Sequence, residues 1–187
     1  LNKNLNIPMK LFGSLLISLI FSFQNLGQTP SKVIPLQLTE APLKPYNFYV
    51  EKTLDVRNIS SNIGRGYGEE NGLLYLKPSY SITKYGAAFF QSKSPQDSSD
   101  YPIQIRINTL NIHEKIIDNM IHGECAIELT FVFNRDGKDI ILTGFKSKTL
   151  FKRSLGEYHN YQTMIERLFR KGASYFNQWM LINYDKN

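Results

Sequence analysis

Four consecutive residues of this sequence, His122-Gly-Glu-Cys125, combine an imidazole, a carboxylate and a thiol. Zinc deaminases bind their metal and move a proton with these residue types, but they need a further pair of cysteines. Cys125 is the only cysteine among the 187 residues. The sequence therefore predicts no metal site and no cofactor, and it favours a buried thiol at the start of a strand.

Nucleophilic catalysis needs a serine or cysteine activated by a histidine. The chain has three histidines, His113, His122 and His159, and it has no Gly-x-Ser-x-Gly sequence. His122 lies too close to Cys125 on one strand-like segment to form a dyad with it. A hydrolase that uses Cys125 or a carboxylate stays open as a minor alternative, and we assign no catalytic residue.

The glycine-rich segment Gly64-Arg-Gly-Tyr-Gly68 has backbone amides that could face a phosphate. A phosphate-binding loop is followed directly by a helix and by a Lys-Ser/Thr pair, and neither follows here. We therefore predict a mobile loop over residues 58–72.

Asp55 and Arg57 are two residues apart in a segment that alternates between apolar and polar side chains. Residues at this spacing share one face of a strand, so the two side chains are predicted to form a structural ion pair. The alternation predicts a strand over residues 46–57, with Phe48, Val50, Leu54 and Val56 on its buried face.

The N-terminal segment has the composition of a secretory signal peptide. Lys10 precedes the uncharged apolar run Leu11–Phe23, and Gly27 offers a small residue for cleavage. The run is too short to cross a bilayer, so residues 1–27 are expected to be removed and to leave a soluble periplasmic or secreted protein. Met9 is a better start than Leu1, which leaves open whether residues 1–8 are translated.

Removing residues 1–27, which contain two lysines and no acidic residue, lowers the net charge from +6 to +4. This charge is scattered and forms no basic stripe, so the composition argues against nucleic-acid binding. Four prolines between residues 28 and 45 predict an extended leader. Residues 46–187 are predicted to form a single domain, whose oligomeric state the sequence leaves open.

The elements of this domain follow from hydrophobic periodicity and turn residues. A short helix is predicted over residues 79–91, and a strand from Pro102 to Ile112 with a bulge near Asn108-Thr109. Asp136-Gly137 predicts a hairpin between strands 123–134 and 138–149. An amphipathic helix over residues 158–182 completes an α+β fold, in which an antiparallel or mixed sheet of four or more strands has this helix packed on one face.

This order of elements resembles small exported bacterial proteins related to transport-auxiliary and envelope-assembly lipoproteins. The resemblance covers residues 46–182 and rests on Asp55-x-Arg57, Ile63-Gly64, Ile103-Gln-Ile-Arg-Ile-Asn-x-Leu110, the hairpin through Asp136-Gly137 and the terminal helix. The chain lacks the cysteine that anchors lipoproteins. The resemblance implies a sheet backed by helices, which binds other envelope components and has no known catalytic residues.

These observations favour a non-enzymatic exported protein that acts through contacts with envelope proteins or surface polymers. The aromatic segment Gly72–Tyr80 is the predicted partner surface. The alternative is a module that binds a small molecule or lipid in a pocket between sheet and helix, lined by Phe131, Tyr175 and Trp179.

Overall fold

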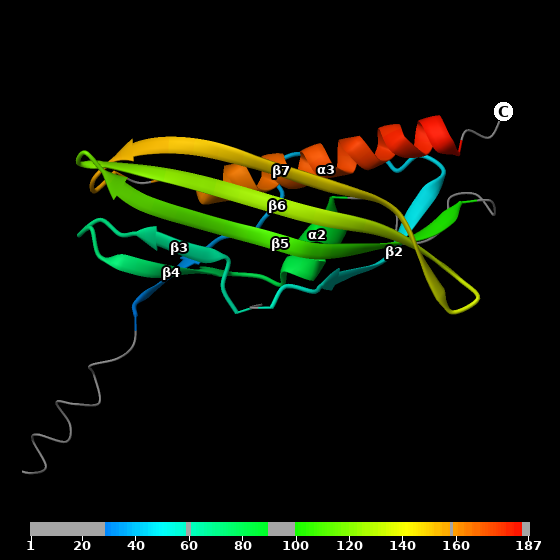
Figure 1. Cartoon of the computed structure of the whole chain (residues 1–187), viewed down its shortest axis with the longest axis horizontal. Helices are drawn as coiled ribbons and strands as arrows, with labels where there is room; N and C mark the ends of the chain where they lie inside the picture. The colour runs from blue at the N-terminus through cyan, green and yellow to red at the C-terminus, as the bar shows by residue number, and fades with distance from the viewer. Residues whose placement is uncertain (1–28, 59–60, 90–99, 158, 185–187) are drawn as a thin grey trace, which may run out of the picture. The chain divides into compact units, whose positions relative to one another are not determined.

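Three long antiparallel strands form the centre of the domain (Figure 1): β5 Tyr101–Ile117, β6 Met120–Arg135 and β7 Lys138–Ser154. The computed structural model describes residues 29–58, 61–89, 100–157 and 159–184. The predicted signal peptide, residues 1–27, lies outside this part of the chain. Ser31–Asn187 is one compact unit, which contains all the elements described below.

Four shorter strands complete a mixed sheet of seven: β1 Ser31–Ile34, β2 Phe48–Asp55, β3 Gly64–Tyr67 and β4 Leu73–Pro78. The order is β1-β4-β3-β5-β6-β7, and β2 pairs with the first half of β5. The β1–β4, β2–β5 and β3–β5 pairs are parallel, and the remaining pairs are antiparallel. The prediction of a mixed sheet of four or more strands is confirmed.

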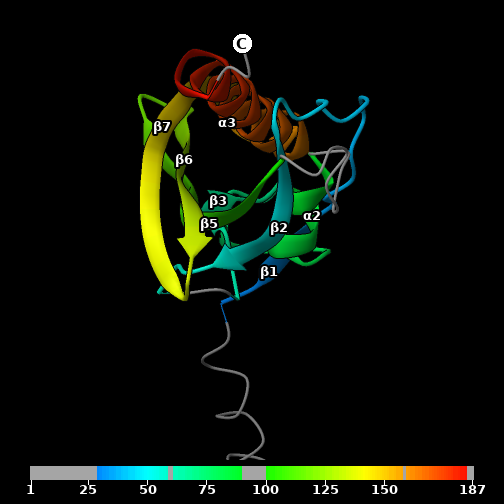
Figure 2. The same ribbon diagram turned by 90° about the vertical axis from the view of Figure 1, so that its right-hand side faces the viewer.

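The C-terminal helix, α3 Tyr161–Asn183, packs on one face of the sheet against β6 and β7 (Figure 2). It begins after Asn160, whose side chain accepts a hydrogen bond from the backbone N–H of Thr163 and so caps the helix. Its apolar stripe faces the sheet, as the periodicity predicted. A shorter helix, α2 Ile82–Ala88, lies within the predicted range 79–91 and contacts β2.

Two bulges change which side chains face the core. The bulge in β5 lies between Ile107 and Thr109, as predicted. A second bulge, in β2 between Val50 and Lys52, was not predicted. It reverses the alternation of the strand, so Leu54 and Val56 are exposed and the prediction that they face the core is wrong.

The prediction of a mobile loop over residues 58–72 is wrong for Gly64–Tyr67, which form β3. Its four residues show no hydrophobic alternation, so the local pattern does not reveal a strand. The strand is defined by its pairing with β4, which is antiparallel, and with β5, which is parallel and distant in the sequence. Gly64 has a φ of +125°, and a Cβ there would lie 1.9 Å from the carbonyl oxygen of Ile112. The glycine is thus required for close pairing with β5 rather than for mobility.

β1 lies in the predicted leader. Ser31–Ile34 runs parallel to β4, and the buried side chains of Ile34 and Leu36 join the core. The folded unit therefore begins at Ser31 and not at residue 46.

The turns of the central sheet use residues that tolerate a positive φ. Asp136 and Gly137 form the predicted hairpin, with φ values of 52° and 75°. Asp118 and Asn119, with φ values of 49° and 59°, form a second tight turn that the sequence reasoning missed. This turn joins β5 to β6 and makes both strands longer than predicted. No helix in the described ranges is long and apolar enough to span a membrane.

Candidate functional site

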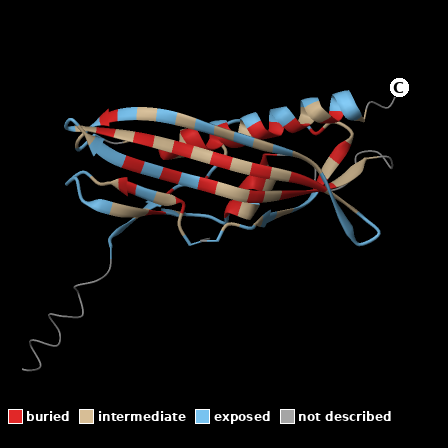
Figure 3. Cartoon of the chain, in the orientation of Figure 1, coloured by how far each residue is buried: buried red, intermediate tan, exposed pale blue. Residues whose placement is uncertain are grey.

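Strand alternation gives the central sheet two different faces, visible in Figure 3 as alternating buried and intermediate residues along β6. The inner face packs against α3. At the end of the sheet nearest the Asp118-Asn119 turn, this face carries Glu114 of β5 and Arg153 of β7, which are 2% and 4% exposed. A guanidinium nitrogen of Arg153 lies 2.8 Å from Glu114 Oε2, so the two residues form a buried ion pair.

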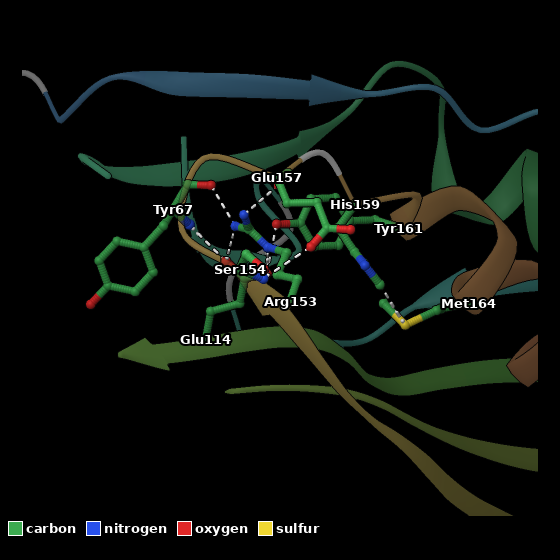
Figure 4. A network of polar contacts seen from close by, with 8 residues as sticks. All are labelled: Tyr67, Glu114, Arg153, Ser154, Glu157, His159, Tyr161 and Met164. Atoms are coloured by element: carbon green, nitrogen blue, oxygen red, sulfur yellow. Dashed lines mark hydrogen bonds and ion pairs between the residues drawn. The ribbon is translucent and has the colours of Figure 1, made fainter. Parts of the chain in front are cut away.

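Every polar atom of this buried ion pair has a partner (Figure 4). The Tyr161 hydroxyl donates to Glu114 Oε1 at 2.8 Å, and the Tyr67 amide donates to Oε2 at 2.7 Å. Arg153 also donates to the carbonyl oxygens of Tyr67 and Glu157, at 2.7 and 2.6 Å. The network therefore joins β3, β5, β7 and the start of α3 at one point.

The charges in the network shift the pKa values of its members. Burial opposes the charge on Arg153, but its hydrogen bonds to Glu114 and the charge of that carboxylate raise the pKa of the guanidinium above its ordinary value. Burial and the neighbouring Glu114 carboxylate raise the pKa of the Tyr161 hydroxyl, which stays protonated and donates. Gly66 of β3 leaves room for the Tyr161 hydroxyl. A Cβ at this position would lie only 2.9 Å from the hydroxyl oxygen.

His159 lies beside the network and is held by apolar contacts. Its ring stacks on Phe151 with centroids 4.1 Å apart, and Nε2 lies 3.3 Å from the sulfur of Met164. Burial lowers the pKa of this imidazole, against the attraction of the Glu114 carboxylate. His159 is therefore neutral at pH 7 and serves as packing.

The outer face of the same strands is exposed, and it carries the sequence neighbours of the buried ion pair. Lys115 of β5 pairs in register with His122 of β6, which pairs with Lys152 of β7. The two lysines and the histidine between them form a row across the sheet, which we call the cationic row after its lysines. In the adjacent row, Glu124 pairs in register with His113 and Leu150.

The cationic row borders an open hollow of about 650 Å³ on this face, which we call the basic hollow. Its lining consists of His113, Lys115, His122, Gly123, Glu124, Leu150, Phe151 and Lys152. Leu150 is 69% exposed, which adds an apolar surface to the cations. The hollow can therefore contact both a negative group and an apolar side chain.

Charge pairing differs along the outer face. Lys148 lies 2.9 Å from Glu124, Lys146 lies 3.8 Å from Glu128, and Arg106 is paired with Asp139. Among the described residues, by contrast, no carboxylate forms an ion pair with Lys115 or Lys152. Glu124, Glu128 and Asp139 thus already form ion pairs with other residues of this face, and the described carboxylates form none with the lysines of the cationic row.

The structure separates the residues of the His122-Gly-Glu-Cys125 sequence. His122 and Glu124 lie on the outer face, and Cys125 lies on the inner face, fully buried. Burial and the charge of Glu124 raise the pKa of the Cys125 thiol to about 12, which disfavours the thiolate that a nucleophile needs. In the part of the chain that the structure describes, no three His, Cys, Asp or Glu residues cluster so as to hold a metal ion.

Asp55 and Arg57 form an ion pair, with Arg57 Nε 2.8 Å from Asp55 Oδ1. The guanidinium also donates to the carbonyl oxygens of Asn62 and Leu110, each at 3.0 Å. The bulge in β2 turns both side chains inward, where they are largely buried. The pair thus connects the end of β2 to β5 and to the start of β3, and it lies away from the basic hollow.

Phe131, Tyr175 and Trp179 have different surroundings in the interface between sheet and helix. Phe131 is fully buried and stacks on Phe176 with centroids 4.0 Å apart, and Trp179 stacks on the same Phe176 ring. Tyr175 points outward and shares a hydrogen bond with the hydroxyl of Thr143. Side chains therefore fill the middle of the interface between sheet and helix.

A small cavity of about 260 Å³ lies nearer the C-terminal end of α3. Its lining consists of Tyr101, Phe133, Arg135, Ile140, Leu142, Met180 and Tyr184. The segment Gly72–Tyr80 contains β4, in which Leu73 is exposed and Leu76 is buried, and exposed Tyr80 lies beyond the end of the strand. Its exposed residues are thus divided between the two ends of the strand.

Sequence reasoning missed the basic hollow, although a signal for it was present. Lys115 and Lys152 flank His122 only once the Asp118-Asn119 turn fixes the register of β5 against β6 and the Asp136-Gly137 hairpin joins β6 to β7. Two adjacent residues that tolerate a positive φ, between strand-like runs, could have indicated that turn.

No protein-family model matches this sequence, and no curated protein matches it. A solved structure that resembles the chain is that of protein XCC0632 from Xanthomonas campestris, described as a member of the DUF330 family. The two are 10% identical with a TM-score of 0.47, and the match covers 81% of this chain and 95% of that one.

Proposed function

We propose that this protein is a non-enzymatic binding protein of the cell envelope, exported by residues 1–27, which holds an anionic partner in the basic hollow. The observation that carries the proposal is the cationic row of Lys115, His122 and Lys152. Lys115 and Lys152 lie on either side of His122 in one row of the sheet, and like charges on neighbouring positions of a sheet face repel one another. A row without its own carboxylates is therefore suited to a negative group supplied from outside.

The chemistry of the lining supports binding rather than reaction. Lysine ammonium and histidine ring nitrogens donate hydrogen bonds to carboxylate or phosphate oxygens. The thiol of Cys125, the one strong nucleophile of the chain, lies on the opposite face of the sheet. The hollow is open to solvent on the outer face, whereas reactive sites are usually closed to water.

The partner that fits best is an acidic protein segment. Exposed Leu150 adjoins Lys152 in the lining, so the surface offers apolar contact next to positive charge. A purely anionic polymer would leave this leucine in water, whereas a polypeptide can cover it with an apolar side chain and place a carboxylate beside the lysine.

Titration with poly-L-glutamate tests the binding site. The variant K115Q/K152Q should bind about tenfold more weakly, because two exposed charge contacts contribute about 0.7 kcal/mol each. The matched control K44Q/K77Q removes two exposed lysines outside β5, β6 and β7 and should bind as the parent does. Equal weakening by both variants would show that net charge alone drives binding and would contradict the proposal.

Export is tested separately in the source cells. After fractionation, mass spectrometry should find the protein outside the cytoplasm with its N-terminus at Gln28. An intact N-terminus in the cytosolic fraction would contradict this part of the proposal, whatever the result of the titration.

A further inference from the structure

β7 is the last strand in the sheet order, and along all 17 residues its strand partner is β6 alone. The other side of its backbone faces no strand in the described ranges. Figures 1 and 2 show α3 lying next to β7, and no further strand of the described residues lies beyond it. Every second residue of such an edge presents an unpaired N–H and C=O, which form a template for another strand.

Natural proteins usually protect an edge strand by keeping it short, bulged or interrupted by proline. β7 contains no proline, and its single irregularity lies near Ile141. From Thr143 to Ser154 the pairing with β6 runs without a register shift. Exposed apolar residues add to this edge, since Ile141 is 67% and Leu150 69% exposed. The edge is therefore long, regular and partly apolar.

The charges of β7 select what can pair with it. Lys146, Lys148 and Lys152 all project from the outer face, with Leu150 between the last two. Lys146 and Lys148 form ion pairs with Glu128 and Glu124, but these pairs are exposed and therefore weak enough for a partner's carboxylates to compete. In an antiparallel pair of two copies centred at any position from Lys146 to Leu150, at least one of these lysines would lie opposite a lysine of the other copy and be repelled. A second copy is therefore a poor occupant, whereas a strand with carboxylates on that face would be attracted.

We infer that β7 accepts an extended acidic segment of a partner protein as an additional strand of the sheet. This inference rests on the proposed function, because it describes how the acidic partner of the basic hollow would be held. Main-chain hydrogen bonds would fix the segment, and its carboxylates would lie opposite Lys146, Lys148 and Lys152. Residues 1–27 of the chain itself contain no Asp or Glu, so they do not supply these carboxylates.

Strand alternation also defines the other face of the incoming segment. The inward residues of β7 over this stretch include Phe145 and Phe151, which are partly buried. Tyr175 of α3 lies beside Phe145, with ring centroids 5.5 Å apart. The fitting segment therefore alternates acidic residues with apolar or β-branched ones.

The test uses a synthetic peptide in which glutamate alternates with valine and threonine, long enough to follow β7 from Thr143 to Ser154. The peptide is added to the isotope-labelled protein, and amide hydrogen exchange is followed by NMR. Amides of alternate residues in this stretch should exchange at least about tenfold more slowly with the peptide bound. A peptide with the same side chains but N-methylated alternate amides should neither bind comparably nor protect β7.

Matched variants separate charge from backbone pairing. K146Q/K148Q should weaken peptide binding, and K44Q/K77Q should not. If the N-methylated peptide binds as well as the parent and no alternate protection develops, strand addition is wrong, although an acidic partner could still occupy the basic hollow. If neither peptide nor poly-L-glutamate binds, the proposed function fails as well. Protection of β7 that rises with protein concentration, without peptide, would show a second copy on the edge and overturn the inference.

Discussion

The two faces of the sheet near the Asp118-Asn119 turn differ in whether their charged side chains are paired. On the inner face, Glu114 and Arg153 are buried, and each polar atom has a hydrogen-bond partner. Lys115 follows Glu114 and Lys152 precedes Arg153, so both lysines are on the outer face, and no carboxylate in the described ranges forms an ion pair with them. The inner face uses charge to hold the fold together, and the outer face leaves charge free for a partner.

The buried ion pair on the inner face positions the cationic row on the outer face. A buried ion pair adds little net stability, because desolvation offsets most of the attraction, but its hydrogen bonds define one geometry. Here that geometry fixes the ends of β5 and β7 relative to each other. Because strand neighbours project to opposite faces, it also fixes the spacing of the cationic row on the outer face.

The largest effect should come from removing one member of the buried ion pair. Glu114→Ala leaves the guanidinium of Arg153 buried without its carboxylate, so the free energy of unfolding should fall by ~3–5 kcal/mol. Urea denaturation at pH 7 measures the change. A loss below about 1 kcal/mol would mean that the inner face tolerates unpaired charge as the outer face does, which would contradict the difference between the two faces.

Gly66→Ala should give the next largest effect. The new Cβ would lie 2.9 Å from the Tyr161 hydroxyl oxygen and 3.0 Å from Glu114 Oε2, so the buried network must shift to admit it. We expect a loss of ~1–3 kcal/mol in the free energy of unfolding, measured by urea denaturation. Gly72→Ala, where a Cβ meets nothing within 4 Å, is the control and should be nearly neutral.

Glu166 of α3 offers a smaller effect that depends on pH. Burial opposes its charge, but hydrogen bonds from Thr39, the Glu40 amide and Arg170 hold the pKa of this carboxyl below its usual value. Stability from a lowered carboxyl pKa is present above the unfolded pKa and is lost as the pH falls through the folded one. Glu166→Gln should therefore cost ~1–2 kcal/mol at pH 7 and progressively less below about pH 4.

Thermal unfolding across this pH range checks the Glu166 prediction. The curves of the variant and the parent should converge in acid. A difference in the free energy of unfolding that stays constant with pH would show that the charge of Glu166 plays no part in joining the β1–β2 connection to α3.

The smallest effect belongs to the outer face. K115Q/K152Q removes the like charges that flank His122, so the free energy of unfolding should change by less than about 0.5 kcal/mol or rise slightly. Chemical denaturation at low salt gives the most sensitive measurement, because exposed charges are then least screened. A loss of more than about 1 kcal/mol would mean that the cationic row supports the fold and is not kept for binding.

Much of the fold could be predicted because its signals are local. The hairpin at Asp136-Gly137, the bulge near Asn108-Thr109 and the C-terminal helix all follow from neighbouring residues in the sequence. β1 and β3 could not be recognised, since each has four residues and is defined by its partners in the sheet. The phase of β2 beyond Val50 was also wrong, because a single bulge reverses it.

The sequence by itself determined the Asp136-Gly137 hairpin, the C-terminal helix, the α+β class and the absence of a paired cysteine. Only the tertiary structure decided which charges are buried. In His113-Glu-Lys115, alternation places the glutamate on one face and its neighbours on the other, but the sequence does not say which face is inside. Arg153, 39 residues away, the Tyr67 amide and the Tyr161 hydroxyl satisfy Glu114 on the inner face. A charge can be buried only where such partners converge, and their convergence is a property of the folded chain.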